Sequence, residues 1–366
     1  MDNIRIKRKR RKQRVSLITN IIFCIITLAA LTGCIILLLN NYVLKNQSEE
    51  TMAQLLAFEE QSENYIYTQA DMNAYIEEAK LAAKEEQRTE LLDELKAKMS
   101  GGGTATAMLR DFFPEDVVVY ADGEYHFFPI SDKLKKHAYV YDNFKLLENG
   151  QVEYVDDTDV VLSKKGIDVS KYQGNIDWKK VAADGVEYAF IRTGARGSTG
   201  GKILSDEKFE DNIEGALKNG IQAGVYFFTQ AITEEEAIEE AEFVLDLIEP
   251  YQISYPVVLD LEEVTSDNAR TAGLTREDNT KNCIAFCETI KDAGYTPMIY
   301  GNLKTFMIML DMEQIEEYEK WFAYYNTPVY FPYEFDIWQY SSKGSVNGIK
   351  TEVDMNVCMQ DFGSNN

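Results

Sequence analysis

Short apolar segments alternate with helix-forming segments from Gly166 onward, and this alternation constrains the fold more than any other feature. Strands separated by helices build parallel sheets, and eight such units close into a barrel. The later strand segments lie too close together for full helices between them. We therefore predict an α/β fold, an irregular TIM-like β/α barrel with abbreviated later repeats. The predicted strands are Ile167–Val169, Tyr188–Thr193, Ala223–Phe228, Pro256–Leu261, Met298–Tyr300, Trp321–Tyr325, Ile337–Tyr340 and Glu352–Met355, and the predicted helices are Trp178–Ala183, Asp206–Asn219, Thr233–Leu247 and Arg276–Asp292.

The fourth predicted strand leads into Asp260 and Glu262, two carboxylates separated by one residue. Side chains at positions i and i+2 of a strand point to the same face, about 6–7 Å apart along the strand. Two acids that face one cavity can supply a proton donor and a negative charge opposite an oxocarbenium-like transition state, as glycosidic hydrolysis requires. Acidic residues are common at strand ends, so the pair alone is weak support for this chemistry.

The other predicted strand ends also carry acids and aromatic rings. Functional residues of a β/α barrel gather at the carboxyl ends of the strands, so we expect these side chains to share one cavity. Acids transfer protons and flat rings stack on sugar faces, although core packing explains each aromatic residue taken singly. We predict a catalytic group of Glu262, Asp260, Asp168 and Asp354, and substrate-binding residues Arg192, Tyr226, Tyr300, Tyr325, Trp338 and Tyr340.

Several segments, in the same order along the chain, resemble the glycoside hydrolase family 25 lysozymes. The resemblance runs from Gly166 to near Phe362, slightly over half the chain. Its motifs include Gly166-Ile167-Asp168-Val169-Ser170-Lys171-Tyr172-Gln173-Gly174, Gly185-Val186-Glu187-Tyr188-Ala189-Phe190-Ile191-Arg192, Asp260-Leu261-Glu262, Trp321-Phe322-Ala323-Tyr324-Tyr325, Trp338-Gln339-Tyr340 and Val353-Asp354-Met355-Asn356.

The resemblance implies cleavage of the β-1,4 bond between N-acetylmuramic acid and N-acetylglucosamine in peptidoglycan. It further implies that Glu262 is the general acid and Asp260 its partner carboxylate, with Asp168 and Asp354 serving binding and electrostatic tuning. We expect burial and nearby negative charge to raise the pKa of Glu262, whereas Asp260 should stay ionised. Either Asp260 or the substrate's own acetamido group could be the nucleophile, and the sequence leaves this open.

One motif departs from the family pattern, because Tyr226-Phe227-Phe228 stands where many members carry Tyr-His-Phe. We expect no loss of activity, since the missing imidazole is not the proposed acid. Residues 166–366 contain no histidine, which disfavours Ser/His/Asp and Cys/His mechanisms. We expect no metal site and no cofactor, because no Asp-rich loop has calcium-binding spacing.

Two other functions fit the same residues. The barrel could be a non-catalytic cell-wall-binding scaffold that uses the same groove, or a glycosidase for a different N-acetylated polysaccharide. The four acids favour the enzyme over the scaffold, because a site that only binds glycan has no need for all of them.

The first 44 residues predict a membrane anchor. Residues 1–14 contain eight Lys or Arg and one acid, and residues 15–44 contain no charged side chain. About 20 apolar residues span a bilayer as a helix, and basic flanks stay in the cytoplasm. We expect a basic cytoplasmic tail (1–14), a single transmembrane signal anchor (15–44) and an extracellular remainder at a bacterial cell membrane.

Two alternatives to this anchor remain open. A cleaved signal peptide usually has a shorter apolar core and a small-residue cleavage site, and none follows Leu39. Leu31-Thr32-Gly33-Cys34 resembles a lipoprotein box, in which Cys34 would be lipidated, but the apolar run continues beyond it.

Between the anchor and the barrel the composition changes twice. Residues 45–103 predict a helical stalk and a glycine hinge, because residues 48–100 lack Gly and Pro and Gly101-Gly102-Gly103 follows them. A dimeric coiled coil, a single solvated helix and a helical hairpin all fit its imperfect apolar spacing. Residues 104–165 predict a small β-rich module with hairpin turns at Asp122-Gly123 and Asn149-Gly150, and its role is left open.

The charge balance restricts the partners. The chain has a net charge of −24, and the part after residue 14 is more acidic still. Phosphate recognition needs clustered Lys and Arg, so we expect no nucleic-acid binding. The expected partners are peptidoglycan glycan strands and, through residues 15–44, the membrane; the barrel is assigned to residues 166–366.

Overall fold

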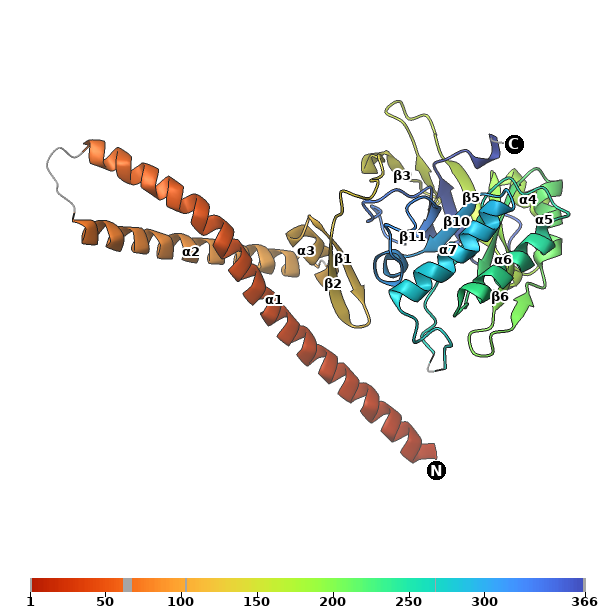
Figure 1. Cartoon of the computed structure of the whole chain (residues 1–366), viewed down its shortest axis with the longest axis horizontal. Coiled ribbons are helices and arrows are strands. Elements are labelled where there is room, and N and C mark those ends of the chain that lie inside the picture. The colour runs from red at the N-terminus through yellow and green to blue at the C-terminus, as the bar shows by residue number, and fades with distance from the viewer. Residues whose placement is uncertain (1, 62–67, 103, 267, 365–366) are drawn as a thin grey trace. The chain divides into compact units, whose positions relative to one another are not determined.

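Two units, Met1–Met108 and Leu109–Asn366, make up the computed structural model of this chain, which describes residues 2–61, 68–102, 104–266 and 268–364. The first unit holds the helices α1 (Asp2–Gln61) and α2 (Gln69–Ser100) and the beginning of α3 (Ala105–Phe112) (Figure 1). A capping box begins α2, in which the Thr68 hydroxyl accepts from the Asp71 N–H and the Asp71 carboxylate accepts from the Thr68 N–H. Helix α2 ends before Gly101, as predicted.

The two long helices contact each other within this unit. Of the three predicted arrangements for residues 45–103, the helical hairpin fits this contact best, and the connection at residues 62–67 lies outside the described residues. The predicted anchor, residues 15–44, lies within α1. Within the described residues, no helix combines the length and the apolar character that crossing a membrane requires.

Eight strands of the second unit close into a barrel, which confirms the predicted α/β barrel. Their order is β5-β13-β12-β11-β10-β9-β8-β6, and pairing of β5 with β6 closes the ring. The last strand differs from a regular TIM barrel, since β13 runs antiparallel to both of its neighbours. The strands are β5 (Lys164–Val169), β6 (Tyr188–Arg196), β8 (Gln222–Phe228), β9 (Val257–Asp260), β10 (Pro297–Gly301), β11 (Glu319–Ala323), β12 (Ile337–Gly344) and β13 (Val353–Cys358).

Full helices accompany only the early strands. They are α4 (Trp178–Ala183), α5 (Phe209–Lys218), α6 (Glu234–Ile248) and α7 (Arg276–Asp292), at nearly the predicted positions. Polar N-caps fix several of their starts; the Thr275 hydroxyl, for example, accepts from the Asp278 N–H at the first turn of α7. A single π-helical turn, Thr305–Met309, follows β10, so the predicted abbreviation of the later repeats is confirmed. The short edge strand β7 (Ile203–Ser205) was not predicted.

Alternating side chains on the strands form two apolar layers. One layer fills the barrel interior with aromatic rings that include Tyr188, Phe190 and Trp321, and the other packs the outward-facing residues against the helices. Only glycine fits at position 166, because a Cβ there would lie 2.1 Å from the Tyr188 ring. Since rings close the interior, open space inside the barrel is left at the carboxyl ends of the parallel strands.

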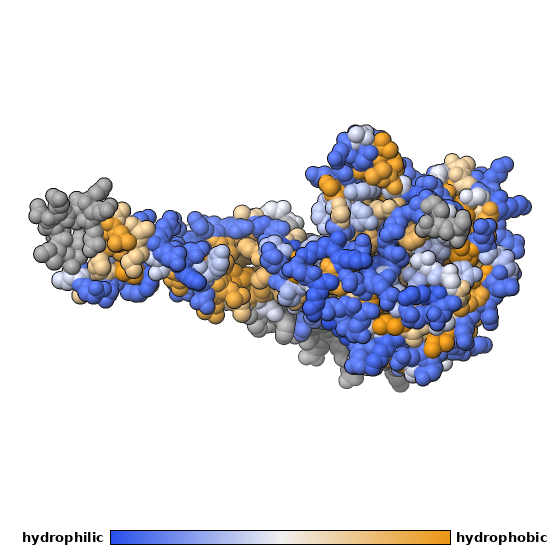
Figure 2. Space-filling view, turned by 45° about the horizontal axis from the view of Figure 1, so that its top comes forward, coloured by the Kyte–Doolittle hydropathy of each residue, from blue (hydrophilic) through white to orange (hydrophobic). Residues whose placement is uncertain are grey.

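The small β-rich module forms both predicted hairpins. Strands β1 (Asp116–Ala121) and β2 (Glu124–Pro129) pair across Asp122-Gly123, and β3 (Phe144–Leu146) pairs with β4 (Val152–Tyr154). Asp122 and Gly123 have φ angles of +54° and +85°, as a tight type I′ turn requires. Val117, Val119, Leu134 and Val152 join the outer apolar layer of the barrel, so the module and the barrel share one core. The face of this unit seen in Figure 2 is mainly hydrophilic, in keeping with its acidic composition.

Candidate active site

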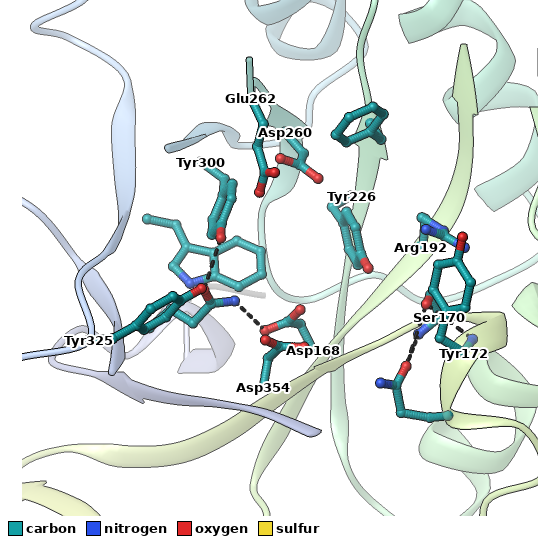
Figure 3. Close-up of a pocket in the computed structure, with 14 residues that line it drawn as sticks. Asp168, Ser170, Tyr172, Arg192, Tyr226, Asp260, Glu262, Tyr300, Tyr325 and Asp354 are labelled. Atoms are coloured by element: carbon teal, nitrogen blue, oxygen red, sulfur yellow. Dashed lines mark hydrogen bonds between the residues drawn. The ribbon is translucent and has the colours of Figure 1, made fainter. Parts of the chain in front are cut away.

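A cavity of about 280 Å³ opens where the parallel strands end. Eight of the ten predicted site residues line it, and their side chains converge in Figure 3. They are Asp168, Arg192, Tyr226, Asp260, Glu262, Tyr300, Tyr325 and Asp354.

Strand pairing brings these residues together from distant parts of the sequence. Asp168 of β5 lies opposite Asp354 of β13, and Asp260 of β9 lies opposite Tyr300 of β10. Because β13 is antiparallel, its beginning lies at the rim where the parallel strands end. This direction places Asp354 beside Asp168, although Asp354 is the second residue of its strand.

Glu262 lies beyond the last residue of β9 but keeps the direction that the strand sets. The Leu261 N–H donates to the Tyr300 carbonyl over 3.2 Å, and the Thr305 hydroxyl donates to the Leu261 carbonyl over 3.1 Å. These two bonds fix the backbone between the acids, so Glu262 and Asp260 point into the same cavity (Figure 3). Glu263 does not line this cavity, and its carboxylate accepts from Lys304 Nζ.

A hydrogen-bond network beneath the acids centres on Gln339. The hydroxyls of Tyr300 and Tyr325 donate to Gln339 Oε1 over 2.9 and 2.7 Å. Gln339 Nε2 then donates to Asp168 Oδ2 over 2.9 Å, and Asn356 Nδ2 donates to the same oxygen over 2.9 Å. The network therefore orients Asp168 and ties the rim residue Tyr325 to the floor of the cavity (Figure 3).

The prediction that Trp338 and Tyr340 face the cavity is wrong. Both side chains lie in the outer apolar layer, and the Trp338 indole N–H donates to the Tyr324 carbonyl over 2.7 Å. Strand alternation accounts for the error: Gln339, between them, is the residue of this segment that points inward. The position of the Trp338-Gln339-Tyr340 strand was predicted correctly, but the side chains predicted to point inward point outward.

Six cavity residues were missing from the predicted site: Ser170, Tyr172, Gln173, Phe228, Trp321 and Gln339. Trp321 forms part of the wall, where its ring stacks on Phe190 with centroids 4.5 Å apart and its indole N–H donates to Asn356 Oδ1. Gln339 gave no signal beyond its place in a motif. Tyr172 lines the mouth and is 70% exposed, so its ring is available for stacking on a sugar. The inward positions of Trp321 and Gln339 follow from the strand-pairing register, which the structure supplies and the local sequence does not contain.

Burial shifts all four carboxyl groups in the same direction. Burial raises the pKa of Glu262, and the Tyr300 hydroxyl opposes this in part. Burial and the Asp354 carboxylate raise the pKa of Asp168 well above its usual range. Burial, followed by a smaller effect of Glu262, raises the pKa of Asp354 to about 6.

Asp260 departs from the expectation that it stays ionised. Burial, followed by the charges of Glu262 and Asp168, raises its pKa well above its usual range, while Arg192 acts in the opposite direction. Its buried Oδ1 has no hydrogen-bond partner among the described residues. An unpartnered carboxyl oxygen in a cavity can accept a hydrogen bond from a ligand N–H or O–H group, which would also favour its ionised form.

Arg192, which lines the cavity, forms an ion pair with Asp206. Its Nε and Nη2 both lie 2.7 Å from Asp206 Oδ2, and its guanidinium lies 5.0 Å from the centroid of the Tyr172 ring. The Asp206 carboxylate is fully buried behind it. The pair therefore offers directed N–H groups at the mouth of the cavity with little net positive charge. Among the residues that the structure describes, no group of three or more His, Cys, Asp or Glu side chains is arranged to hold a metal ion.

The outward position of Tyr340 can be tested against the inward position of Tyr325. We expect Tyr325→Phe to lower kcat/KM by about 10-fold, because it removes a donor to Gln339 and loosens Asp168. Tyr340→Phe removes a hydroxyl outside the cavity and should change kcat/KM by less than about 2-fold. Steady-state kinetics on soluble peptidoglycan fragments checks both variants, and a larger loss in Tyr340→Phe would contradict the observed strand phase.

The missing imidazole of the Tyr226-Phe227-Phe228 segment also has a structural explanation. Phe227 is fully buried in the outer layer, where its ring lies 5.8 Å from that of Phe243. The position therefore points away from the cavity, whereas Tyr226 and Phe228 line it. An apolar residue is suited to this place.

Carboxyl groups with raised pKa values, set among rings that can stack on sugars, define the site of a glycoside hydrolase. A model of the glycosyl hydrolases family 25 matches residues 167–349, half of the chain. The chain therefore belongs to glycosyl hydrolase family 25, which confirms the resemblance seen in the sequence, and it is a glycoside hydrolase of the lysozyme type.

Known relatives match between half and two thirds of the chain. The uncharacterized protein YegX of Escherichia coli K12 is 30% identical over 201 residues, which cover 52% of this chain and 68% of the relative. The autolytic lysozyme of Clostridium acetobutylicum is 25% identical over 192 residues, 52% of this chain and 54% of that protein. Among solved structures, the modular autolysin LytC of Streptococcus pneumoniae superimposes with a TM-score of 0.50 and 25% identity, covering 66% of this chain and 56% of LytC.

Proposed function

We propose that this protein hydrolyses the β-1,4 bond between N-acetylmuramic acid and N-acetylglucosamine in peptidoglycan. The observation that carries the proposal is the pairing of Glu262 with Asp260 on one wall of the strand-end cavity. The names of its relatives, an autolytic lysozyme and a modular autolysin, support the same substrate.

Glu262 acts as the general acid in this proposal. Hydrolysis needs a carboxylic acid that is still protonated near neutral pH, so that it can protonate the oxygen of the leaving sugar. Burial raises the pKa of Glu262 and so keeps the proton available. The open face of its carboxyl group is the cavity, where the glycosidic oxygen would lie.

Asp260 acts on the sugar on the other side of the cleaved bond. Its unpartnered Oδ1 is suited to accept the N–H of the acetamido group on the N-acetylmuramic acid. Such a bond would orient the acetamido oxygen towards the anomeric carbon and stabilise the positive charge that develops there. Asp168, which accepts hydrogen bonds from Gln339 and Asn356, and Asp354 line the same cavity and add negative potential there in their ionised forms.

Reducing-end analysis of purified peptidoglycan tests the proposal. The full chain, in detergent micelles, should release new N-acetylmuramic acid reducing ends, identified by mass spectrometry after borohydride reduction. N-acetylglucosamine ends would assign a different glycosidic bond. Binding to peptidoglycan without new ends would favour the scaffold function, and release from a different N-acetylated polysaccharide alone would favour the third alternative.

The pH dependence of the reaction follows from the raised pKa of Glu262. The acid works in its protonated form, so activity is present below its pKa and lost as the pH rises through it. Because burial raises that pKa, the basic limb of kcat/KM should lie above the value of 4.5 that an exposed glutamate would give. Asp354→Asn removes a negative charge near Glu262 and should therefore move the basic limb to lower pH. If the basic limb stays at the same pH, the electrostatic coupling of Glu262 and Asp354 is contradicted.

We further propose that the chain is held at the outer face of a membrane by residues 15–44. The uncharged character of this segment and the eight basic residues before it support a signal anchor. Expression of the full chain and of a chain lacking residues 1–44 tests the proposal, since only the full chain should remain with the membrane fraction after a carbonate wash. Incorporation of labelled palmitate, or sensitivity of processing to globomycin, would instead indicate lipidation at Cys34. Dimerisation through the helical stalk, residues 45–103, remains a prediction.

A further inference from the structure

We propose that the module of residues 109–165 positions the catalytic cavity, by holding the loop between β11 and β12 that carries Tyr325. The inference rests on the proposed function and gives a role to a segment outside the family match, which begins at residue 167. In the structure this module is continuous with the core of the barrel. We infer that it is a working part of the enzyme and that Arg110 is its main positioning residue.

Arg110 contacts two tyrosines of the loop between β11 and β12. Its Nη1 donates to the Tyr324 hydroxyl over 2.6 Å, and its guanidinium lies 3.6 Å from the centroid of the Tyr330 ring. A guanidinium over a tyrosine face gains a cation–π attraction in addition to its hydrogen bonds. Arg110 therefore connects two tyrosines that lie six residues apart in the same loop.

The module ties the same loop at further points. The Tyr330 hydroxyl accepts from the Val118 N–H over 2.9 Å and donates to the Asp116 carbonyl over 3.1 Å, so it pairs with the open edge of β1. The Tyr333 hydroxyl accepts from the Ser131 N–H over 3.0 Å. A segment that carries no helix or strand is thus fixed along its length by main-chain groups of the module.

The hold on Tyr324 is transmitted directly to the cavity. The Tyr324 N–H donates to the Gln339 carbonyl over 3.0 Å, and its own carbonyl accepts from Trp338. The next residue, Tyr325, turns the opposite way and donates to Gln339 Oε1, and Gln339 donates to Asp168. Contacts therefore run without interruption from Arg110 to a proposed catalytic carboxylate.

Packing alone does not hold Tyr325 in this position. Its side chain is 52% exposed at the rim, so its orientation depends on its backbone and on one bond to Gln339. The module also covers the outward face of β12, where the Phe144 and Trp338 rings meet edge to face at 5.3 Å. This contact explains why Trp338 points outward: it anchors the strand of Gln339 to the module.

A second arm of the module reaches the other side of the cavity. Asp122, at the turn of the β1–β2 hairpin, accepts from Lys304 Nζ over 2.7 Å, and Lys304 also donates to Glu263. Glu263 follows the proposed general acid directly. The module therefore contacts the segments after β10 and β11 directly, and it is linked to the segment after β9 through Lys304.

Arg110→Ala in the full chain tests the inference, with Lys133→Ala as the matched control. Lys133 belongs to the same module and pairs with Glu313 at its exposed edge, away from the cavity. We expect Arg110→Ala to lower kcat/KM on soluble peptidoglycan fragments by about 10-fold, because small displacements of positioned groups are costly to catalysis. Lys133→Ala should change it by less than about 2-fold.

A double variant separates positioning from general destabilisation. If Arg110 acts through Tyr325, Arg110→Ala should cost less than about 2-fold when Tyr325 is already phenylalanine, because coupled residues are not additive. Equal losses in both backgrounds would overturn the inference. Tyr324→Phe, which removes only one oxygen, should reproduce most of the loss and so excludes misfolding as its cause.

Hydrogen exchange provides a readout that does not depend on activity. The amides of Tyr324 and its neighbours should exchange about 10-fold faster in Arg110→Ala than in the unmodified chain or in Lys133→Ala. Unchanged exchange together with unchanged kinetics would overturn the inference. If the unmodified chain fails to cleave peptidoglycan, the proposed function fails, and the exchange data still decide whether the module holds the loop.

Discussion

Glu262→Gln is expected to lower the release of reducing ends from peptidoglycan by about 10³-fold, the range in which a general acid contributes to catalysis. Glutamine has nearly the same shape but cannot deliver a proton to the leaving oxygen. The substitution also removes an acid whose charged form is disfavoured by burial. The melting temperature should therefore stay unchanged or rise, which distinguishes lost chemistry from lost folding.

Glu263→Gln is the matched control for this experiment. The neighbouring carboxylate pairs with Lys304 and does not line the cavity that Glu262 shares with Asp260, Asp168 and Asp354. Its side chain is 41% exposed, so loss of the ion pair should cost little stability. We expect Glu263→Gln to keep most of the activity, and equal losses in the two variants would contradict the placement of Glu262 as the acid.

The second large effect is expected for Asp260→Asn, with kcat lowered by about 10²–10³-fold. The variant cannot carry negative charge beside the developing positive charge. It also changes the acceptor that we propose for the acetamido N–H. The effect should be mainly in kcat, because the interaction strengthens as the transition state forms.

Asp260→Ala with added azide separates the two open mechanisms. If Asp260 is the nucleophile, azide can occupy its place and yield a glycosyl azide that mass spectrometry detects. If the acetamido group attacks, azide should not restore turnover, and substrates lacking the acetyl group should react poorly even with the unmodified enzyme. Full activity of Asp260→Asn would contradict both roles for this residue.

The structure also changes how the four acids should be considered. The sequence predicted one protonated and one ionised carboxyl group, whereas burial raises the pKa of every member of the group, and repulsion between the acids adds to this effect for Asp168, Asp260 and Asp354. Raised pKa values mean that the folded chain binds protons more tightly than the unfolded chain. These acids therefore lower the free energy of unfolding as the pH rises from about 4 towards neutrality.

The eight strands and their catalytic acids could be predicted because their signals are local. Apolar runs, helix caps and the spacing of Asp260 and Glu262 are properties of a few neighbouring residues. Strand pairing then needs only the barrel to bring such segments to a common rim. The family motifs and the carboxyl ends of the strands thus identified eight residues that the cavity brings together.

The phase of β12 could not be predicted for a physical reason. Ile337, Trp338, Gln339 and Tyr340 lie in a strand that is buried on both faces, so polarity does not mark the inward side. The reversed direction of β13 and the site role of Trp321 depend likewise on contacts between distant segments. No window of local sequence contains those contacts.

The sequence by itself determined the family, the barrel and the identity of its acids, because these follow from local pattern and motif. The tertiary structure decided which aromatic rings line the cavity, how far burial raises the pKa values of the four acids, and how the module of residues 109–165 packs against the barrel. Those properties arise from burial between segments that are 171 to 214 residues apart, such as Asp168 with Gln339 and Arg110 with Tyr324. Burial, and the desolvation that accompanies it, exists only once the chain has folded.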